Sequence, residues 1–235
     1  MKLGIMQPYF FPYLGYFSLI KHTDKWIVFD SVQYIRHGWI ERNRILKPQE
    51  GWQYISVPLK KHTRETLIKD IRINNDEDWT NKIIRQLEHY KKKAPYYKNV
   101  MTLLDKIFQK KYDSIVNLDV TCLAEVCIYL QINFNYSIYS ELNLQIEQVN
   151  KPDEWALNIC KALKASEYIN LPGGIQFFNR DKFIDQKINI SFQNIILNPY
   201  NQYKTSFIPG LSIIDVMMFN SIEEINKMLN DYELL

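Results

Sequence analysis

The spacing of apolar positions changes along the chain and predicts alternating strands and helices. Short apolar stretches at 2–6 and 26–30 predict two strands, and the stretch 14–22 between them predicts a short helix. Two more strands are predicted over 52–59 and 67–73, on either side of a polar turn. The N-terminal part of the chain therefore has the pattern of an α/β fold.

The middle of the chain has helical spacing. Large apolar and aromatic side chains recur on one predicted helix face at Trp79, Ile83, Ile84, Leu87 and Tyr90. We expect this helix to begin at Asn75 or Asp76 and to end before Pro95. Helical spacing continues beyond it, so we expect a mainly helical segment over about 76–131 within a single domain spanning 1–235.

The C-terminal part alternates again between strand and helix patterns. Strands are predicted over 133–140, 168–171 and 188–197, with a helix over 150–165. Two more helices are predicted near the C-terminus, and Ser221 opens the second one with the spacing of a capping box. Together with the N-terminal pattern, this alternation predicts a Rossmann-like three-layer α/β core with a helical insertion.

Composition excludes several classes of protein. The chain of 235 residues is 46% hydrophobic, and no apolar run reaches the ~18 residues of a membrane helix. The start of the chain lacks the pattern of a secretory signal, and the three cysteines lack disulfide or zinc spacing. A net charge of +3, with both signs interleaved, gives no support to nucleic-acid binding. We therefore expect a cytoplasmic protein with no membrane span and no nucleic-acid partner.

An unusually aromatic segment, QPYFFPYLGYF, follows the first predicted strand. Pro8 and Pro12 stiffen this loop, because proline fixes its own φ and favours extended geometry in the preceding residue. Loops at the carboxyl ends of strands form the ligand site of α/β sheets. We therefore predict that Gln7, Tyr9 and Tyr16 bind a substrate. The structural alternative is that the aromatic rings only build the core.

Polar and charged side chains crowd the segment after the second predicted strand. Arginine beside asparagine suits planar recognition of a phosphate or carboxylate. The predicted substrate-binding residues here are Gln33, Arg42, Asn43 and Arg44, and Gly173 in the later LPGG turn joins them. Asp30 and His37 are the candidate proton acceptors, and no metal site is predicted. A solvated surface loop is the alternative interpretation.

Several separate stretches together resemble the WbqC-like family of bacterial proteins. They are QPYFFPYLGYF, DSVQY, NRI, WQYISVPL, YKKKAPYY, PYNQ and LSIIDVMMFN, in this order along the chain. The family often has a histidine where this chain has Met6. The resemblance implies a role in the assembly of bacterial surface polysaccharide such as O-antigen, where some members are described as glycine transferases acting on amino sugars. The first loop also resembles the opening of pantothenate synthetase-type folds, which implies ATP as a cofactor.

These resemblances lead to one expected function and two alternatives. We expect transfer of glycine or another small acyl group to the amino group of a nucleotide-linked amino sugar. The donor would be a small acyl or amino-acid compound, activated by ATP or supplied in an activated form. The alternatives are a non-catalytic protein that binds a sugar nucleotide or glycan, and an ATP-dependent carboxylate-amine ligase. The familiar signatures GxSxG, P-loop, HExxH and GxGxxG are absent, so motifs do not choose among these.

Overall fold

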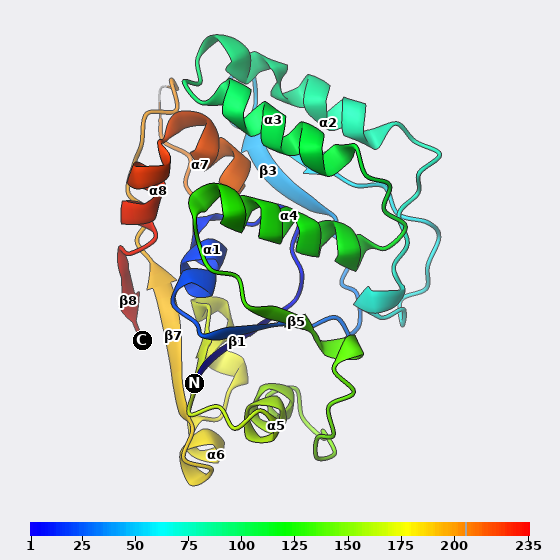
Figure 1. Cartoon of the computed structure of the whole chain (residues 1–235), viewed down its shortest axis with the longest axis vertical. Coiled ribbons are helices and arrows are strands. Elements are labelled where there is room, and N and C mark those ends of the chain that lie inside the picture. The colour runs from blue at the N-terminus through cyan, green and yellow to red at the C-terminus, as the bar shows by residue number, and fades with distance from the viewer. Residues whose placement is uncertain (205) are drawn as a thin grey trace.

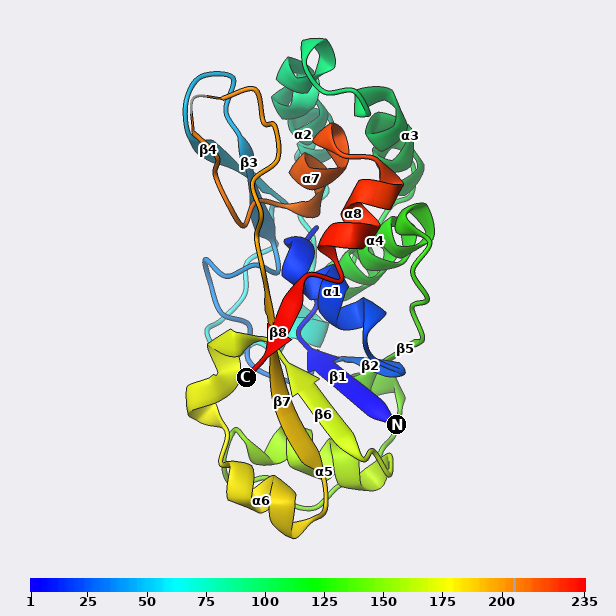
Figure 2. The same cartoon turned by 90° about the vertical axis from the view of Figure 1, so that its left-hand side faces the viewer.

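A six-stranded sheet lies at the centre of the fold in the computed structural model, which describes residues 1–204 and 206–235 (Figures 1 and 2). The strands are β1 (Lys2–Met6), β2 (Lys25–Val28), β5 (Tyr136–Ile138), β6 (Glu167–Asn170), β7 (Asn189–Ile195) and β8 (Tyr232–Leu234). They lie in the order β5-β2-β1-β6-β7-β8, and all neighbours are parallel except β7 and β8. Chain order reverses between β1 and β6, which is the doubly wound arrangement of Rossmann-like folds.

Helices cover both faces of this sheet. The α-helices are α1 (Leu14–Lys21), α2 (Trp79–Leu87), α3 (Tyr97–Phe108), α4 (Ile115–Leu130), α5 (Glu154–Ala162), α6 (Arg180–Asp185), α7 (Ile213–Phe219) and α8 (Ile222–Met228). In Figure 1, α5 and α6 lie below the sheet, and α1, α4 and α8 lie above it. In the described part of the chain, no helix is both long enough and apolar enough to cross a bilayer.

The alternation of side chains in β1 explains the three layers. Leu3 and Ile5 point to one face and pack in a core cluster with α5 and α6. On the other face, Trp26 of β2 packs in a larger cluster with α1 and α4. Gly4 leaves room for the Trp26 ring, since a Cβ at Gly4 would lie 2.6 Å from it. The predicted Rossmann-like three-layer core is confirmed.

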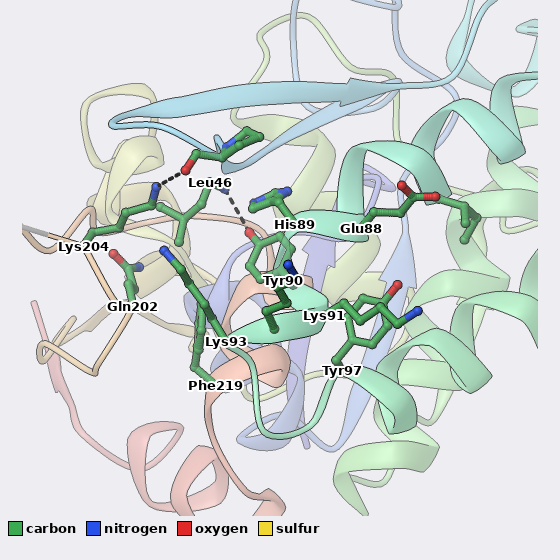
Figure 3. Close-up of a pocket in the computed structure, with 13 residues that line it drawn as sticks. Leu46, Glu88, His89, Tyr90, Lys91, Lys93, Tyr97, Gln202, Lys204 and Phe219 are labelled. Atoms are coloured by element: carbon green, nitrogen blue, oxygen red, sulfur yellow. Dashed lines mark hydrogen bonds between the residues drawn. The ribbon is translucent and has the colours of Figure 1, made fainter.

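Helices α2 and α3 of the helical segment form a further layer beyond α4 (Figure 1). Helix α2 continues as a 3-10 helix over Glu88–Lys92, and α2, α3 and α4 contribute to the same core cluster as α1. The hydroxyl of Tyr90 accepts a hydrogen bond from the backbone amide of Leu46 (Figure 3). It donates one to Asp215 of α7. This segment is thereby joined to the rest of the molecule, and we retain the single domain as a prediction.

Some predicted elements differ from the observed ones. The strand predicted over 67–73 is wrong, because that segment forms a 3-10 turn (Ile68–Asp70) flanked by isolated bridges instead of a ladder. Further 3-10 helices span Tyr139–Glu141 and Pro172–Phe177. Two strands form a separate antiparallel hairpin, β3 (Arg42–Leu46) and β4 (Trp52–Ser56). β3 was expected as a loop, because its arginines mask the strand alternation that buries Asn43 and Ile45. The capping box at Ser221 is confirmed.

Candidate functional site

A cavity of about 780 Å³ opens at the carboxyl ends of β1 and β6, where the chain order of the sheet reverses. This is the usual place and size for a small-molecule site in an α/β protein. Its wall is rich in aromatic rings, contributed by Tyr9, Tyr13, Phe29, Trp39, Trp155, Tyr168, Phe177 and Phe178. We call it the switch-point cavity.

The predicted site residues divide into two groups. Those that line the switch-point cavity are Gln7, Tyr9, Asn43, Arg44 and Gly173. Those that the structure places elsewhere are Tyr16, Asp30, Gln33, His37 and Arg42. Residue type does not explain which predicted residues line the cavity. The contacts of each side chain do.

The aromatic loop after β1 is held in a strained conformation. Phe11 has a φ of 42°, which is unfavourable for a residue with a side chain. The side-chain amide nitrogen of Asn43, Nδ2, donates to the carbonyl oxygens of Phe10 and Phe11, at 3.0 Å each. The hydroxyl of Ser212 donates to the Phe11 carbonyl at 2.8 Å. Residues from β3 and from the N-terminus of α7 therefore fix the loop that carries Gln7 into the cavity.

Tyr16 supports this loop from behind and does not line the cavity. Its side chain is completely buried, and its hydroxyl donates to the carbonyl of Gln7 at 2.7 Å. Burial raises its pKa well above the usual value, and burial followed by the nearby Tyr9 raises the pKa of Tyr13 to about 12. The hydroxyls of Tyr9 and Tyr13 in the cavity wall thus remain neutral donors at physiological pH.

Arg44 is the basic group of the cavity. Its guanidinium lies 5.4 Å from the ring of Trp39 and 5.2 Å from the ring of Trp52, and it donates to the carbonyl of Gly210 at 3.1 Å. No ion pair joins it to a carboxylate among the described residues, and its buried Nε has no hydrogen-bond partner there. A cation held between aromatic rings without an acidic partner is suited to bind an anion.

Arg42 lies two residues earlier on the same strand but has different surroundings. Its guanidinium stacks 4.1 Å from the ring of Tyr54, and it donates to the carbonyls of Gly38 and His37. These bonds turn the side chain back onto its own loop. The two arginines predicted to act together are therefore separated.

The predicted proton acceptors lie outside the cavity wall. Asp30 is 1% exposed, and its two oxygens accept hydrogen bonds from the amide and the hydroxyl of Ser140, at 3.0 and 2.6 Å. This carboxylate therefore anchors the 3-10 turn after β5. His37 is exposed, with a φ of 62°, and Gln33 is exposed and donates to the carbonyl of Arg64.

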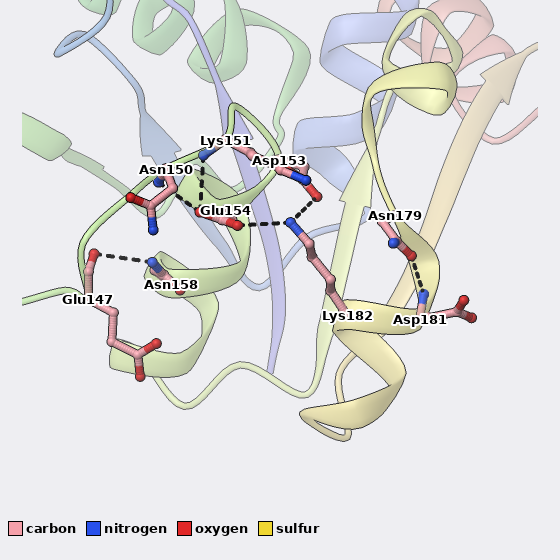
Figure 4. Close-up of polar contacts among 9 residues, drawn as sticks. All are labelled: Glu147, Asn150, Lys151, Asp153, Glu154, Asn158, Asn179, Asp181 and Lys182. Atoms are coloured by element: carbon pink, nitrogen blue, oxygen red, sulfur yellow. Dashed lines mark hydrogen bonds and ion pairs between the residues drawn. The ribbon is translucent and has the colours of Figure 1, made fainter.

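A different carboxylate, Asp153, lines the cavity just before α5. It is 6% exposed and lies 3.0 Å from the ammonium of Lys182 on α6, which also contacts Glu154 at 2.9 Å (Figure 4). The sequence does not indicate that Asp153 belongs to the site, since its partner Lys182 comes from a distant helix. Among the described residues that line the cavity, Asp153 is the only carboxylate, and no group of three or more metal-ligating side chains occurs in the described chain.

A doubly wound sheet with an aromatic cavity at its switch point places this chain among the Rossmann-like α/β proteins. The model of the WbqC-like protein family matches residues 7–227, so the chain belongs to this family. It is also similar to Uncharacterized protein Rv1507c of Mycobacterium tuberculosis, with 28% identity over 227 residues and coverage of 93% of both chains. No solved structure matches the chain. The family resemblance predicted from the sequence is confirmed.

Proposed function

We propose that this protein binds a nucleotide-linked amino sugar in the switch-point cavity and transfers glycine or another small acyl group to the sugar's amino group. The observation that carries the proposal is Arg44, a cation without an acidic partner among the described residues, inside a wall of aromatic rings. A diphosphate supplies two anionic groups for such a cation, and the aromatic rings offer faces for a base or a pyranose. The family's expected connection with surface polysaccharide supports the same substrate class.

The remaining polar groups of the cavity suit the sugar. Gln7, Asn170 and Asn194 bring amide groups to the wall, which can both donate to and accept from hydroxyls. Gly173 leaves the turn after β6 open, because nothing lies within 4 Å of the position where its Cβ would be. The wall thus combines flat apolar faces with a few directed polar groups, as small-molecule sites do.

The reaction needs a neutral amine, an activated carbonyl and an acceptor for one proton. The amine nitrogen attacks the carbonyl carbon and forms the amide bond, and the bond from the carbonyl carbon to the leaving group breaks. We assign the released proton to Asp153, because it lines the cavity whereas Asp30 and His37 lie outside its wall. The hydroxyls of Tyr9 and Tyr13 are available to stabilise the developing oxyanion.

The test compares two arginines on one strand. Binding of UDP-, GDP- and dTDP-linked amino sugars is measured by isothermal titration calorimetry for the wild type, Arg44→Ala and Arg42→Ala. We expect the dissociation constant to rise by about tenfold or more for Arg44→Ala, since a charge-assisted bond is lost, and by less than about twofold for Arg42→Ala. Equal effects of the two substitutions, or no binding of any of these compounds, would refute the proposal.

A non-catalytic binding role is the second candidate. It is supported by the ion pair between Asp153 and Lys182, which already engages the one carboxylate of the described cavity wall. Mass spectrometry after incubation with acyl donors and ATP separates the candidates. An amide product that disappears in Asp153→Asn supports transfer, formation of AMP with the product indicates a ligase, and tight binding without product indicates the accessory role.

A further inference from the structure

A second cavity, of about 650 Å³, lies beside the C-terminal end of β3, where Leu46 lines it. Residues far apart in sequence form it: Leu46 at the end of β3, the 3-10 helix after α2, Tyr97 of α3, Phe219 of α7 and the segment with Gln202 (Figure 3). We call it the lysine cavity. The sequence stretch YKKKAPYY enters its wall, and the proposed function gives that stretch no role.

The charges of this cavity have one dominant sign. In the described part of the chain, its wall contains Lys91, Lys92, Lys93 and Lys204, against the single carboxylate of Glu88. Among the described residues, none of the four lysines forms an ion pair. Ammonium groups gathered in a concave surface create a positive potential that attracts anions.

Two of the four lysines lie near His89. Figure 3 shows Lys93, Lys204 and Gln202 at the same end of the cavity as His89, with Glu88 toward the other end. Burial, followed by the charges of Lys204 and Lys93, lowers the pKa of His89. Both lysines are thus close enough to disfavour its protonation, and an anion bound here would remove that penalty.

Unused hydrogen-bonding capacity lies at the same end. Nδ1 of His89 donates to the carbonyl of Gln86 at 2.9 Å, whereas its buried Nε2 has no partner among the described residues and becomes a donor when a bound anion favours protonation of the ring. The ammonium of Lys204 donates to the backbone carbonyls of Pro48 and Gln49, and it keeps a third proton for another acceptor. These groups can meet the oxygens of one anionic ligand.

The rest of the wall is apolar and aromatic. Leu46, Ile84, Tyr97 and Phe219 line it, and Tyr90 lies between His89 and Phe219, with ring centroids 4.3 and 5.6 Å away. A free inorganic ion would leave this surface without a partner. The wall therefore suits a ligand that has an anionic group joined to a flat ring.

We propose that the lysine cavity binds a small molecule in which a phosphate group is joined through a short linker to an aromatic ring, as in nucleotides, with Lys93, Lys204 and His89 on the phosphate. This site is separate from the switch-point cavity, and the proposal does not rest on the function proposed for that cavity.

The experiment uses AMP, adenosine and inorganic phosphate as probes in calorimetric titrations of the whole protein at low salt. Lys93→Gln with Lys204→Gln removes two charges from the lysine cavity. Lys110→Gln with Lys111→Gln removes two exposed charges outside the walls of both cavities and serves as the matched control. We expect AMP to bind more tightly than either other probe. Its dissociation constant should rise by about tenfold or more in the cavity pair and by less than about twofold in the control pair.

Two further readouts keep the proposal falsifiable. In the wild type, AMP should raise the pKa of His89, which is measured from the NMR signal of its ring proton. AMP should bind to the Arg44→Ala variant as tightly as to the wild type. The proposal is overturned if adenosine or inorganic phosphate binds as tightly as AMP, if both lysine pairs lose affinity equally, or if the His89 signal does not respond. Loss of AMP binding in Arg44→Ala would overturn it too, because AMP would then occupy the switch-point cavity.

Discussion

Substitution of Asn43 by alanine tests how the loop that builds the switch-point cavity is held. Asn43 is 3% exposed, and its side chain makes three hydrogen bonds. Two go to the carbonyls of Phe10 and Phe11, and the third accepts from the amide of Arg44 at 2.8 Å. The Phe11 carbonyl keeps its bond from Ser212, so the substitution mainly deprives the Phe10 carbonyl and the Arg44 amide of their partner.

The cost follows from the surroundings of these two groups. Phe10 is completely buried, so leaving its carbonyl without a donor lowers the free energy of unfolding by about 1–3 kcal/mol. The backbone amide of Arg44 is partly accessible to water, so the loss of its bond to Asn43 lowers the free energy of unfolding by about 0.5–1.5 kcal/mol. We therefore expect Asn43→Ala to lower the free energy of unfolding by about 3 kcal/mol.

Urea unfolding followed by tryptophan fluorescence measures this loss. With a slope of about 2–3 kcal/mol per molar urea, the midpoint should fall by about 1–1.5 M. The control is Asn81→Ala, because Asn81 is exposed and, in the described part of the chain, its side chain bonds only to Asp78, just before the same helix. We expect the control to change stability by less than about 0.5 kcal/mol. If Asn43→Ala shifted the midpoint no more than the control does, Asn43 would not hold the loop and a role in direct ligand contact would be favoured.

Two further predictions concern the core. Asp215 is fully buried, and burial raises its pKa to about 6 from 3.8. A carboxyl whose pKa is raised by folding stabilises the protein fully below pH ~4, and about 3 kcal/mol of stability is lost as the pH rises to ~6. In Asp215→Asn, the free energy of unfolding measured with urea should no longer fall between these pH values. If the variant showed the same pH dependence as the wild type, this prediction would be contradicted. Gly4→Ala should lower the free energy of unfolding by about 1–3 kcal/mol, since the new Cβ would lie 2.6 Å from the Trp26 ring. Gly173→Ala is the control, because its new Cβ meets no neighbour within 4 Å. Equal unfolding midpoints for the two variants would disprove the packing argument.

Much of the fold could be predicted because its signals are local. The strand, loop, helix and strand at the start, the helix with Trp79 and Ile83 on its buried face, and the capping box at Ser221 each depend on residues close in sequence. The alternation of these elements was enough to predict a Rossmann-like core, because parallel strands need helical connections on both faces of the sheet. The aromatic loop was placed correctly at the carboxyl end of the first strand for the same reason.

The site itself depended on contacts between distant segments. Arg42 and Arg44 have the same local pattern, but Tyr54 and the loop carbonyls hold the first, whereas two tryptophans and Gly210 leave the second in the cavity wall. Asp153 gains its place through Lys182 of another helix. Sequence alone therefore determined most of the strands and helices, apart from β3 and the turn over Ile68–Asp70, because hydrophobic periodicity acts over a few residues. Only the tertiary structure decided which side chains face a common cavity, because long-range packing and hydrogen bonding orient each of them.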